Sequence, residues 1–217
     1  MLCQDSPLGA RLLKSCLLGA PNAGKSSLLN HLTLKTVSAV SNKYNTTTEA
    51  TLGVLTDQAT KTQLTFTDTP GVTKASNSMR SSLLVTKAWE CIEENDQVIF
   101  VVDAAKRLSF EVREALIRLN RRSQGFDVQS RRMMEAIEDD TFQESNLEKY
   151  LLSEQQKSQE GGLPCILVLN KVDLITNKRK MRNLQGELND LARFDHTFHI
   201  SCSSGFGVET LKEYLIE

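Results

Sequence analysis

Short apolar runs alternate with amphipathic stretches along most of this chain. We predict strands, from apolar runs of suitable length, at 15–19, 50–56, 62–68, 97–103, 165–170 and 197–201. We predict helices, where apolar residues recur at helical spacing, at 25–34, 81–93, 111–121, 178–193 and 208–216. The strands at 50–56 and 62–68 are joined by a short polar turn, which requires an antiparallel pair. We therefore expect an α/β fold: a mostly parallel six-stranded sheet with one antiparallel strand, helices on both faces, and a ligand at the carboxyl ends of the strands.

A glycine-rich loop follows the first of these strands. Residues 19–26 read Gly-Ala-Pro-Asn-Ala-Gly-Lys-Ser, between the apolar run 12–18 and the first predicted helix, and match the phosphate-loop pattern G-x-x-x-x-G-K-[ST]. Such a loop presents backbone N–H groups and the positive end of a helix to an anion. Lys25 is expected to reach the outer phosphates of a nucleotide, and Ser26 to ligate Mg²⁺. The expected phosphate contacts are Gly19, Ala20, Pro21, Asn22, Ala23, Gly24, Lys25, Ser26 and Ser27.

A second motif indicates which base is bound. Asn-Lys-Val-Asp at 170–173 follows a buried apolar run. The carboxylate of Asp173 can accept two hydrogen bonds from the N1–H and the exocyclic amine of guanine, whereas adenine would leave it unpaired. Asn170 can reach guanine N7, and the alkyl stem of Lys171 can lie along the ring. Combined with the phosphate loop, this motif favours GTP over ATP.

Near the end of the chain, the turn Ser201-Cys202-Ser203 follows the last predicted strand. A backbone N–H of Cys202 or of Ser203 can donate to guanine O6. By itself this run indicates only a turn, and its place after the base motif makes it a candidate for the same site.

The motif Asp68-Thr69-Pro70-Gly71 closes the predicted strand 62–68. At the carboxyl end of that strand, Asp68 faces the phosphate loop and can hold Mg²⁺ through water. Gly71 can bring its backbone N–H to the γ-phosphate because no side chain intervenes. We expect all four residues to contact the nucleotide or its metal.

A polar segment at 41–49 contains Thr46-Thr47-Thr48 and has no core-forming pattern. A hydroxyl there, assigned here to Thr47, can close onto Mg²⁺ and the γ-phosphate, so that GTP would order the segment and hydrolysis would release it. A solvated threonine-rich loop is the equal alternative.

The order of these motifs resembles the Era-type GTPases of the TrmE-Era-EngA superfamily, within the translation-factor class. The strings that carry the resemblance are GAPNAGKSSLLN, NTTTE, DTPG, NKVD and SCSSG, and the mitochondrial form resembles the chain most. Thr48-Glu49 replaces the Arg-His that usually follows the threonine pair, and Cys202 stands where alanine is common. The resemblance implies a P-loop GTPase fold, with 1–217 as one G domain. It also implies a role in assembly of the small ribosomal subunit.

The resemblance further implies how GTP would be hydrolysed. We assign catalytic roles to Lys25, Thr47 and Gly71, with Ser26, Thr47 and Asp68 as the Mg²⁺ ligands. Val72 stands where Ras-type GTPases carry the glutamine that orients the attacking water, so slow intrinsic hydrolysis is expected. In related enzymes an asparagine at the position of Asn22 helps to hold K⁺. A turn-forming role after Pro21 is the equal alternative for Asn22.

Composition limits the partners. The formal net charge of −1 gives no general attraction to nucleic acid, so any RNA contact must be local or made by another domain. Era-type proteins continue into an RNA-binding KH domain, whose Gly-x-x-Gly loop this sequence lacks, and the small subunit and its rRNA are expected partners through that domain. A polar stretch at 122–162 interrupts the pattern, and we interpret it as a disordered insertion in preference to a partner-binding one.

No apolar run is long enough to span a bilayer, and a monomer is expected. The resemblance places the protein in the mitochondrial matrix, with the presequence absent from this chain, and the cytoplasm is the alternative. Three other functions stay open. They are the G domain of a tRNA-modification GTPase, another ribosome-associated GTPase, and a GTP-binding interaction module without catalysis.

Overall fold

The computed structural model describes residues 9–33, 51–69, 91–92, 94–123 and 163–217, apart from the side chains of 118 and 121–123. Thr47, Pro70, Gly71 and Val72 lie outside the described residues. So do most of the helix predicted at 81–93 and of the stretch predicted as an insertion at 122–162. Residues 122 and 123 of that stretch continue a helix.

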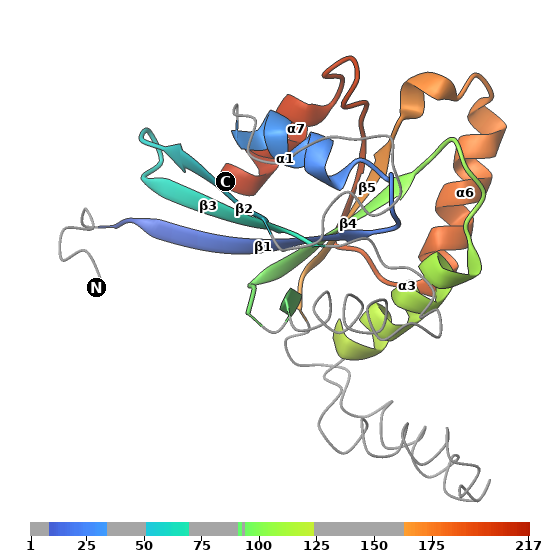
Figure 1. Ribbon diagram of the computed structural model, residues 1–217, viewed down its shortest axis with the longest axis horizontal. Coiled ribbons are helices and arrows are strands. Elements are labelled where there is room, and N and C mark those ends of the chain that lie inside the picture. Colours follow the sequence, from blue (N-terminus) through green and yellow to red (C-terminus); the bar gives the residue numbers. More distant parts are fainter. Residues whose placement is uncertain (1–8, 34–50, 70–90, 93, 124–162) are drawn as a thin grey trace, which may run out of the picture.

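A six-stranded sheet forms the centre of the domain, in the order β2-β3-β1-β4-β5-β6 (Figure 1). The strands are β1 (Arg11–Gly19), β2 (Thr51–Asp57), β3 (Thr62–Asp68), β4 (Gln97–Asp103), β5 (Cys165–Asn170) and β6 (His196–His199). β2 and β3 are antiparallel, and every other neighbouring pair is parallel. The predicted mixed sheet with one antiparallel strand is therefore confirmed.

Helices cover both faces of the sheet. They are α1 (Lys25–Thr33), α3 (Phe110–Ser123), α6 (Lys178–Leu191) and α7 (Val208–Ile216), with a 3₁₀ turn, η1 (Val172–Leu174), after β5. α1 and α7 lie on one face, and α3 and α6 on the other (Figure 1). Among the described helices, none is long and apolar enough to cross a membrane.

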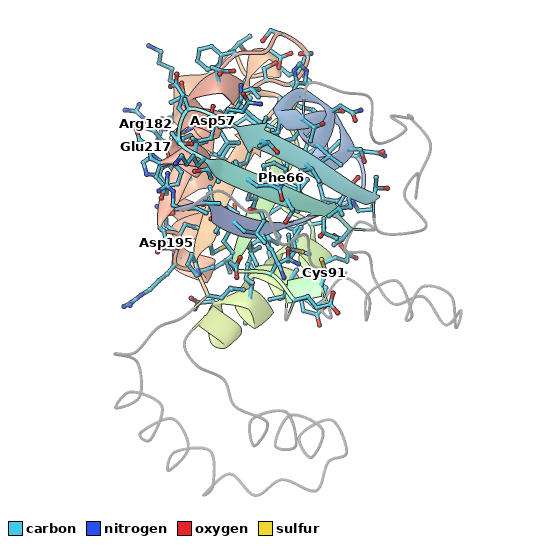
Figure 2. The ribbon with its side chains drawn as sticks, turned by 90° about the vertical axis from the view of Figure 1, so that its left-hand side faces the viewer. Asp57, Phe66, Cys91, Arg182, Asp195 and Glu217 are labelled. Carbon is cyan, nitrogen blue, oxygen red and sulfur yellow. The ribbon has the colours of Figure 1, made fainter. Side chains whose placement is uncertain are left out.

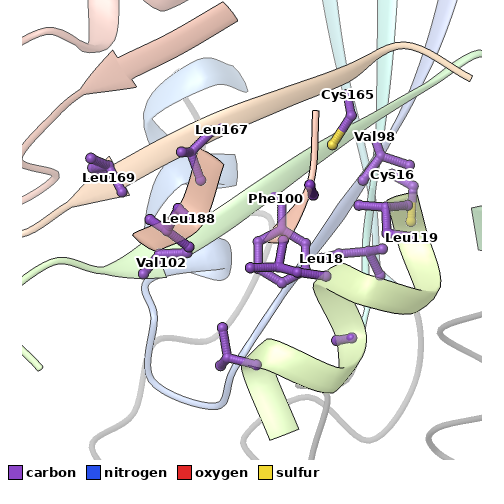
Figure 3. Packing of buried hydrophobic residues seen from close by; sticks show 14 of the residues in the cluster. Cys16, Leu18, Val98, Phe100, Val102, Leu119, Cys165, Leu167, Leu169 and Leu188 are labelled. Carbon is purple, nitrogen blue, oxygen red and sulfur yellow. The ribbon is translucent and has the colours of Figure 1, made fainter. Parts of the chain in front are cut away.

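The sheet separates two apolar cores, and β4 contributes to both. Phe100 packs with Leu18 and Leu119 on the α3 side (Figure 3), whereas Ile99 and Val101 face the core beneath α1 and α7. Every residue of β4 and β5 is buried, as expected for parallel strands covered on both faces. The predicted ligand site lies at the carboxyl ends of these strands, at Asp103 and Asn170.

β1 differs from its prediction at its beginning. The apolar run 12–18 is fully buried only from Ser15 onward, and Leu12 is 54% exposed. β1 pairs with β3 along its whole first half but meets β4 only from Ser15 to Gly19, so its outer residues have a strand neighbour on one side. β6 also differs, because it ends at His199 and Ser201 forms only an isolated bridge with Phe206.

Candidate functional site

The loop between β1 and α1 has a backbone that few residue types tolerate. Gly19 and Gly24 have φ values of 142° and 102°, and Asn22 has a φ of 62°. A Cβ atom on Gly19 would collide with the carbonyl oxygen of Val101, and one on Gly24 with the amide of Asn170. Both glycines are therefore required by close approach as well as by φ. Asparagine is among the residues that best tolerate the left-handed region, so Asn22 has a backbone reason for its identity.

Lys25 is buried inside this loop, with 6% of its surface exposed. Its Nζ donates to the carbonyl oxygens of Gly19 and Ala20, both at 3.0 Å. Burial lowers the pKa of Lys25 to about 8, and the nearby carboxylate of Asp68 opposes that shift. The loop therefore holds a single buried ammonium group at the start of α1, where an anion would also meet the helix N-terminus.

Asp68 meets the loop because β3 runs parallel to β1, with Leu17 and Asp68 in register. The hydroxyl of Ser26 donates to Oδ2 of Asp68 at 2.5 Å, and Asp68 is fully buried. A hydroxyl and a carboxylate are hard oxygen donors, which suit Mg²⁺. The hydroxyl of the next residue, Thr69, donates to the carbonyl oxygen of Leu17 at 2.7 Å. This hydrogen bond connects the end of β3 to β1.

Asn170 joins three motifs that are far apart in the sequence. Its side chain is 1% exposed, and Nδ2 donates to the carbonyl oxygen of Ala23 at 2.9 Å. Its Oδ1 accepts from the backbone N–H of Cys202 at 3.1 Å and of Lys171 at 2.8 Å. The amide thus fixes the phosphate loop, the base motif and the last turn as one frame. Nδ2 carries a second N–H donor besides the one that it gives to Ala23.

Lys171 crosses from the base motif to the phosphate loop. Its Nζ donates to the carbonyl oxygen of Asn22 and to Oδ2 of Asp103, both at 2.7 Å. Asp103 ends β4, is 9% exposed, and also accepts from the N–H of Ala105 through Oδ1 at 3.1 Å. Asp103 belongs to none of the motifs that predicted the site. The signal that would have found it is its place at the carboxyl end of a strand, next to the end of β5.

Asp173 stands exposed on η1 at the edge of this frame. The hydroxyls of Ser201 and then Ser203 lower its pKa, so the carboxylate is ionised at neutral pH. The Ser203 hydroxyl donates to Asp173 at 3.3 Å, and the Ser201 and Ser203 hydroxyls are 2.9 Å apart. The Cys202 N–H already donates to Asn170, so of the two candidates for guanine O6 the Ser203 N–H remains.

The structure thus brings together most of the residues that the sequence selected. The described part of the site contains residues 19–27, Asp68, Thr69, 170–173 and the turn 201–203. Outside the site, Gly53 of β2 packs so closely against α1 that a Cβ there would press on Leu29 and Thr33.

A family model of "50S ribosome-binding GTPase" matches residues 14–171, a span that contains the phosphate loop, Asp68 and the start of the base motif. The chain belongs to this GTPase family. The match confirms the prediction of a GTP-binding G domain.

Within the family, the chain is similar to Era proteins. It is 34% identical to GTPase Era of Maricaulis maris over 201 residues, covering 93% of this chain and 55% of the relative. It is 32% identical to GTP-binding protein ERG of Antirrhinum majus, covering 93% of this chain and 40% of the relative. It is 31% identical to mitochondrial GTPase Era of Salmo salar, covering 85% of this chain and 33% of the relative. The chain thus spans about half or less of the length of these relatives.

Two solved structures share the fold. Era in complex with MgGDPNP and a fragment of 16S ribosomal RNA superposes with a TM-score of 0.69 at 23% identity, covering 95% of this chain and 56% of that one. An Era variant of Aquifex aeolicus bound to GDP·AlF4⁻ superposes with a TM-score of 0.63 at 24% identity, with the same coverage. At these identities the likeness establishes the G-domain fold.

Proposed function

We propose that this domain binds Mg²⁺ and GTP and hydrolyses GTP to GDP and phosphate. The observation that carries the proposal is the frame built on Asn170, which connects the phosphate loop at Ala23 to the turn at Cys202. A frame of this kind holds a phosphate site and a base site at a fixed separation, as a nucleotide requires. The family of the chain and the nucleotides bound to its structural relatives agree with it.

At the phosphate end, we assign the outer phosphates to Lys25 and to backbone N–H groups of the loop 19–27, in which Pro21 has no N–H to donate. Ser26 and Asp68 are the described residues that would hold Mg²⁺, with Thr47 as a further ligand outside the described residues. When bound, the metal would neutralise charge on the phosphate oxygens. Lys25 would stabilise the same charge from the protein side, at an already desolvated position where electrostatic interactions are strong.

At the base end, Asp173 would accept from the N1–H and the exocyclic amine of guanine. The N–H of Ser203 would donate to O6, and the second N–H of Asn170 to N7. Lys171 is held at its ammonium by Asp103 and Asn22, which leaves its alkyl stem to lie along the ring. Adenine offers neither of the donors that Asp173 requires, so the ionised carboxylate would exclude ATP.

Hydrolysis is expected to be slow without a partner. Val72 cannot orient the attacking water, so catalysis would depend on Lys25, Thr47 and the N–H of Gly71. We propose that the loops carrying Thr47 and Gly71 order around Mg·GTP and are released by hydrolysis. Thr47, Gly71 and Val72 lie outside the described residues.

We also propose that K⁺, held by the side-chain oxygen of Asn22, stimulates the reaction. The ion would place positive charge near the β- and γ-phosphates, a role for which we assign no arginine. The alternative explanation for an asparagine at position 22 is its left-handed backbone conformation, which asparagine tolerates well. Asn22→Gly removes the side chain and keeps that conformation accessible, so it separates the two. The proposal requires faster hydrolysis in KCl than in NaCl at equal ionic strength, lost in Asn22→Gly. Equal rates in the two salts contradict it.

For the biological role, we propose assembly of the small ribosomal subunit, in the mitochondrial matrix or alternatively in the cytoplasm. The support is the similarity to mitochondrial and bacterial Era proteins and the 16S ribosomal RNA bound to one structural relative. The relatives extend well beyond the matched region, and a KH domain there would contact the rRNA, with the protein acting as a monomer.

Single-turnover hydrolysis tests the proposed activity. With the protein in excess over γ-labelled nucleotide, phosphate release from GTP should require Mg²⁺ and cease on chelation. ATP at the same concentration serves as the matched substrate and should not be hydrolysed. Tight binding of GTP with no release above the uncatalysed rate would instead support a non-catalytic interaction module.

A further inference from the structure

The first half of α6 carries an unusual charge arrangement. Its first turn contains no acidic residue and its last turn no basic residue, while Lys178, Arg179 and Arg182 are all exposed. The positive end of a helix dipole is stabilised by acidic side chains, so these cations stand where they oppose the dipole. Asn177 begins the helix, accepting from the N–H of Arg179 at 2.9 Å, so the helix start does not require the basic residues.

A second exposed basic segment lies against this half of α6. Nζ of Lys180 donates to the carbonyl oxygen of Ala105 at 2.9 Å, which fixes the start of the helix beside the loop after β4. That loop contributes Lys106 and Arg107. We call the whole group the α6 basic patch, formed by Lys106, Arg107, Lys178, Arg179, Lys180 and Arg182.

Among the described residues around the patch, the acidic side chains are Asp103, Asp173, Glu187 and Asp190, with Glu111 and Glu114 on α3 after the loop. Asp103 is buried and pairs with Lys171, and Nζ of Lys106 lies 3.7 Å from its Oδ2. Asp173 is exposed on the turn before α6. The acidic residues of α6 are Glu187, which pairs with Arg113 of α3, and Asp190, both in its second half. Because the chain has 26 basic and 27 acidic residues, the patch is a local feature and not a result of overall charge.

We propose that the α6 basic patch binds the phosphate backbone of an RNA. Arg179 and Arg182 offer planar guanidinium groups suited to bidentate contact with phosphate oxygens, and the lysines add point charges. A helix that inserts into a membrane surface places an apolar face there, whereas the apolar face of α6, at Leu184 and Leu188, is buried in the core. Figure 2 shows Arg182 at the periphery of the molecule. The choice of RNA rests on the proposed ribosomal function.

Fluorescence anisotropy with a fluorescein-labelled RNA hairpin tests this proposal on the 217-residue chain. The patch variant is Lys178→Gln/Arg179→Gln/Arg182→Gln. The control removes three exposed positive charges elsewhere, as Lys14→Gln/Lys61→Gln/Arg193→Gln. We expect the patch variant to bind at least tenfold more weakly at 50 mM salt. Its dependence of log K on log[salt] should fall by about 2 to 3, since each phosphate contact contributes about 0.7 to 0.9. The control should change affinity less than twofold.

Equal losses in the two triple variants, or no loss in either, would overturn the proposal. So would tighter binding of the unmodified chain to vesicles of anionic phospholipid than to the RNA. Arg182→Glu alone, which leaves the start of the helix unaltered, should weaken RNA binding about threefold or more, and an unchanged affinity would contradict the patch. Binding of fluorescent GDP, measured on every variant, reports the nucleotide site separately. A chain that binds RNA through the patch but binds no GDP would support the patch and contradict the proposed function.

Discussion

The phosphate end and the base end of the site are constructed differently. At the phosphate end, the ionisable groups are buried, and Lys25 and Asp68 are held by hydrogen bonds within the protein. At the base end, the framing residue Asn170 is buried, but Asp173, the residue assigned to read the base, is exposed. A buried charge interacts strongly with a ligand charge, whereas an exposed carboxylate gains most from the exact set of donors opposite it. Affinity should therefore depend mainly on the phosphate end and the choice of base on the other end.

The largest expected effect is at the phosphate end. Lys25→Ala should reduce single-turnover GTP hydrolysis by about 10²- to 10³-fold or more, because the ammonium offsets charge on the outer phosphates. GTP affinity should fall as well. Lys14→Ala, which alters an exposed lysine on β1, is the matched control and should leave both quantities unchanged. Hydrolysis at the parental rate in Lys25→Ala would remove this lysine from the phosphate site.

Asp173→Asn should change which base is bound. We expect GTP affinity to fall by roughly 10²-fold or more, because two donors of guanine lose their acceptor. Binding of xanthosine triphosphate should improve, since its extra carbonyl suits an amide donor. Asp190→Asn alters another exposed acid, on α6, and should affect neither nucleotide. Unchanged affinities for both nucleotides in a titration of Asp173→Asn would show that the base lies elsewhere.

Asp103 connects the two ends through Lys171, and a double-mutant cycle can measure that connection. Asp103→Asn should weaken GDP binding about tenfold, because Lys171 loses the anion that holds its ammonium. In the Lys171→Ala background, the same substitution should have little further effect. Lys106→Ala removes the more distant cation, at 3.7 Å from Asp103, and should be silent. Additive effects of Asp103→Asn and Lys171→Ala would assign Asp103 to fold stability alone.

The lowered pKa of Lys25 gives the phosphate end a pH dependence. Below about pH 8 the ammonium is charged and GDP affinity should be constant. Above pH 8 the free protein loses that proton, so affinity should fall by up to tenfold per pH unit. Fluorescent GDP titrations from pH 6.5 to 9.5 measure this slope. Guanine itself also ionises in this pH range, and the Lys25→Ala variant is the control for that effect. If affinity fell equally steeply with pH in Lys25→Ala, the assignment to Lys25 would be contradicted.

The sequence predicted the regular elements well, because local patterns determine them. The bounds predicted for β3, β4, β5 and α7 agree with the structure. The strand predicted at 15–19 was too short, because β1 begins at Arg11 and residues 11–14 pair with β3 although they are largely exposed.

Within the site, motifs predicted which residues meet but not all of their contacts. The Asn170 side chain, which was predicted to contact the base, also joins Ala23 to Cys202, and these two partners are distant from it in sequence. Asp103 was missed for the same reason, because an acid at a strand end is common and its partner Lys171 becomes visible only in the fold. The roles predicted for Thr47 and Gly71 stay predictions.

Competition against fluorescent GDP is the most direct test of the central claim, that this site holds a guanine nucleotide through a buried phosphate end and a base-reading carboxylate. The unmodified chain should be titrated with GDP, GTP, ADP and ATP at one Mg²⁺ concentration and ionic strength. The guanine nucleotides should compete at least about 10³-fold more strongly than their adenine counterparts, because adenine leaves Asp173 without donors. Adenine nucleotides that compete within tenfold of the guanine nucleotides would contradict the account.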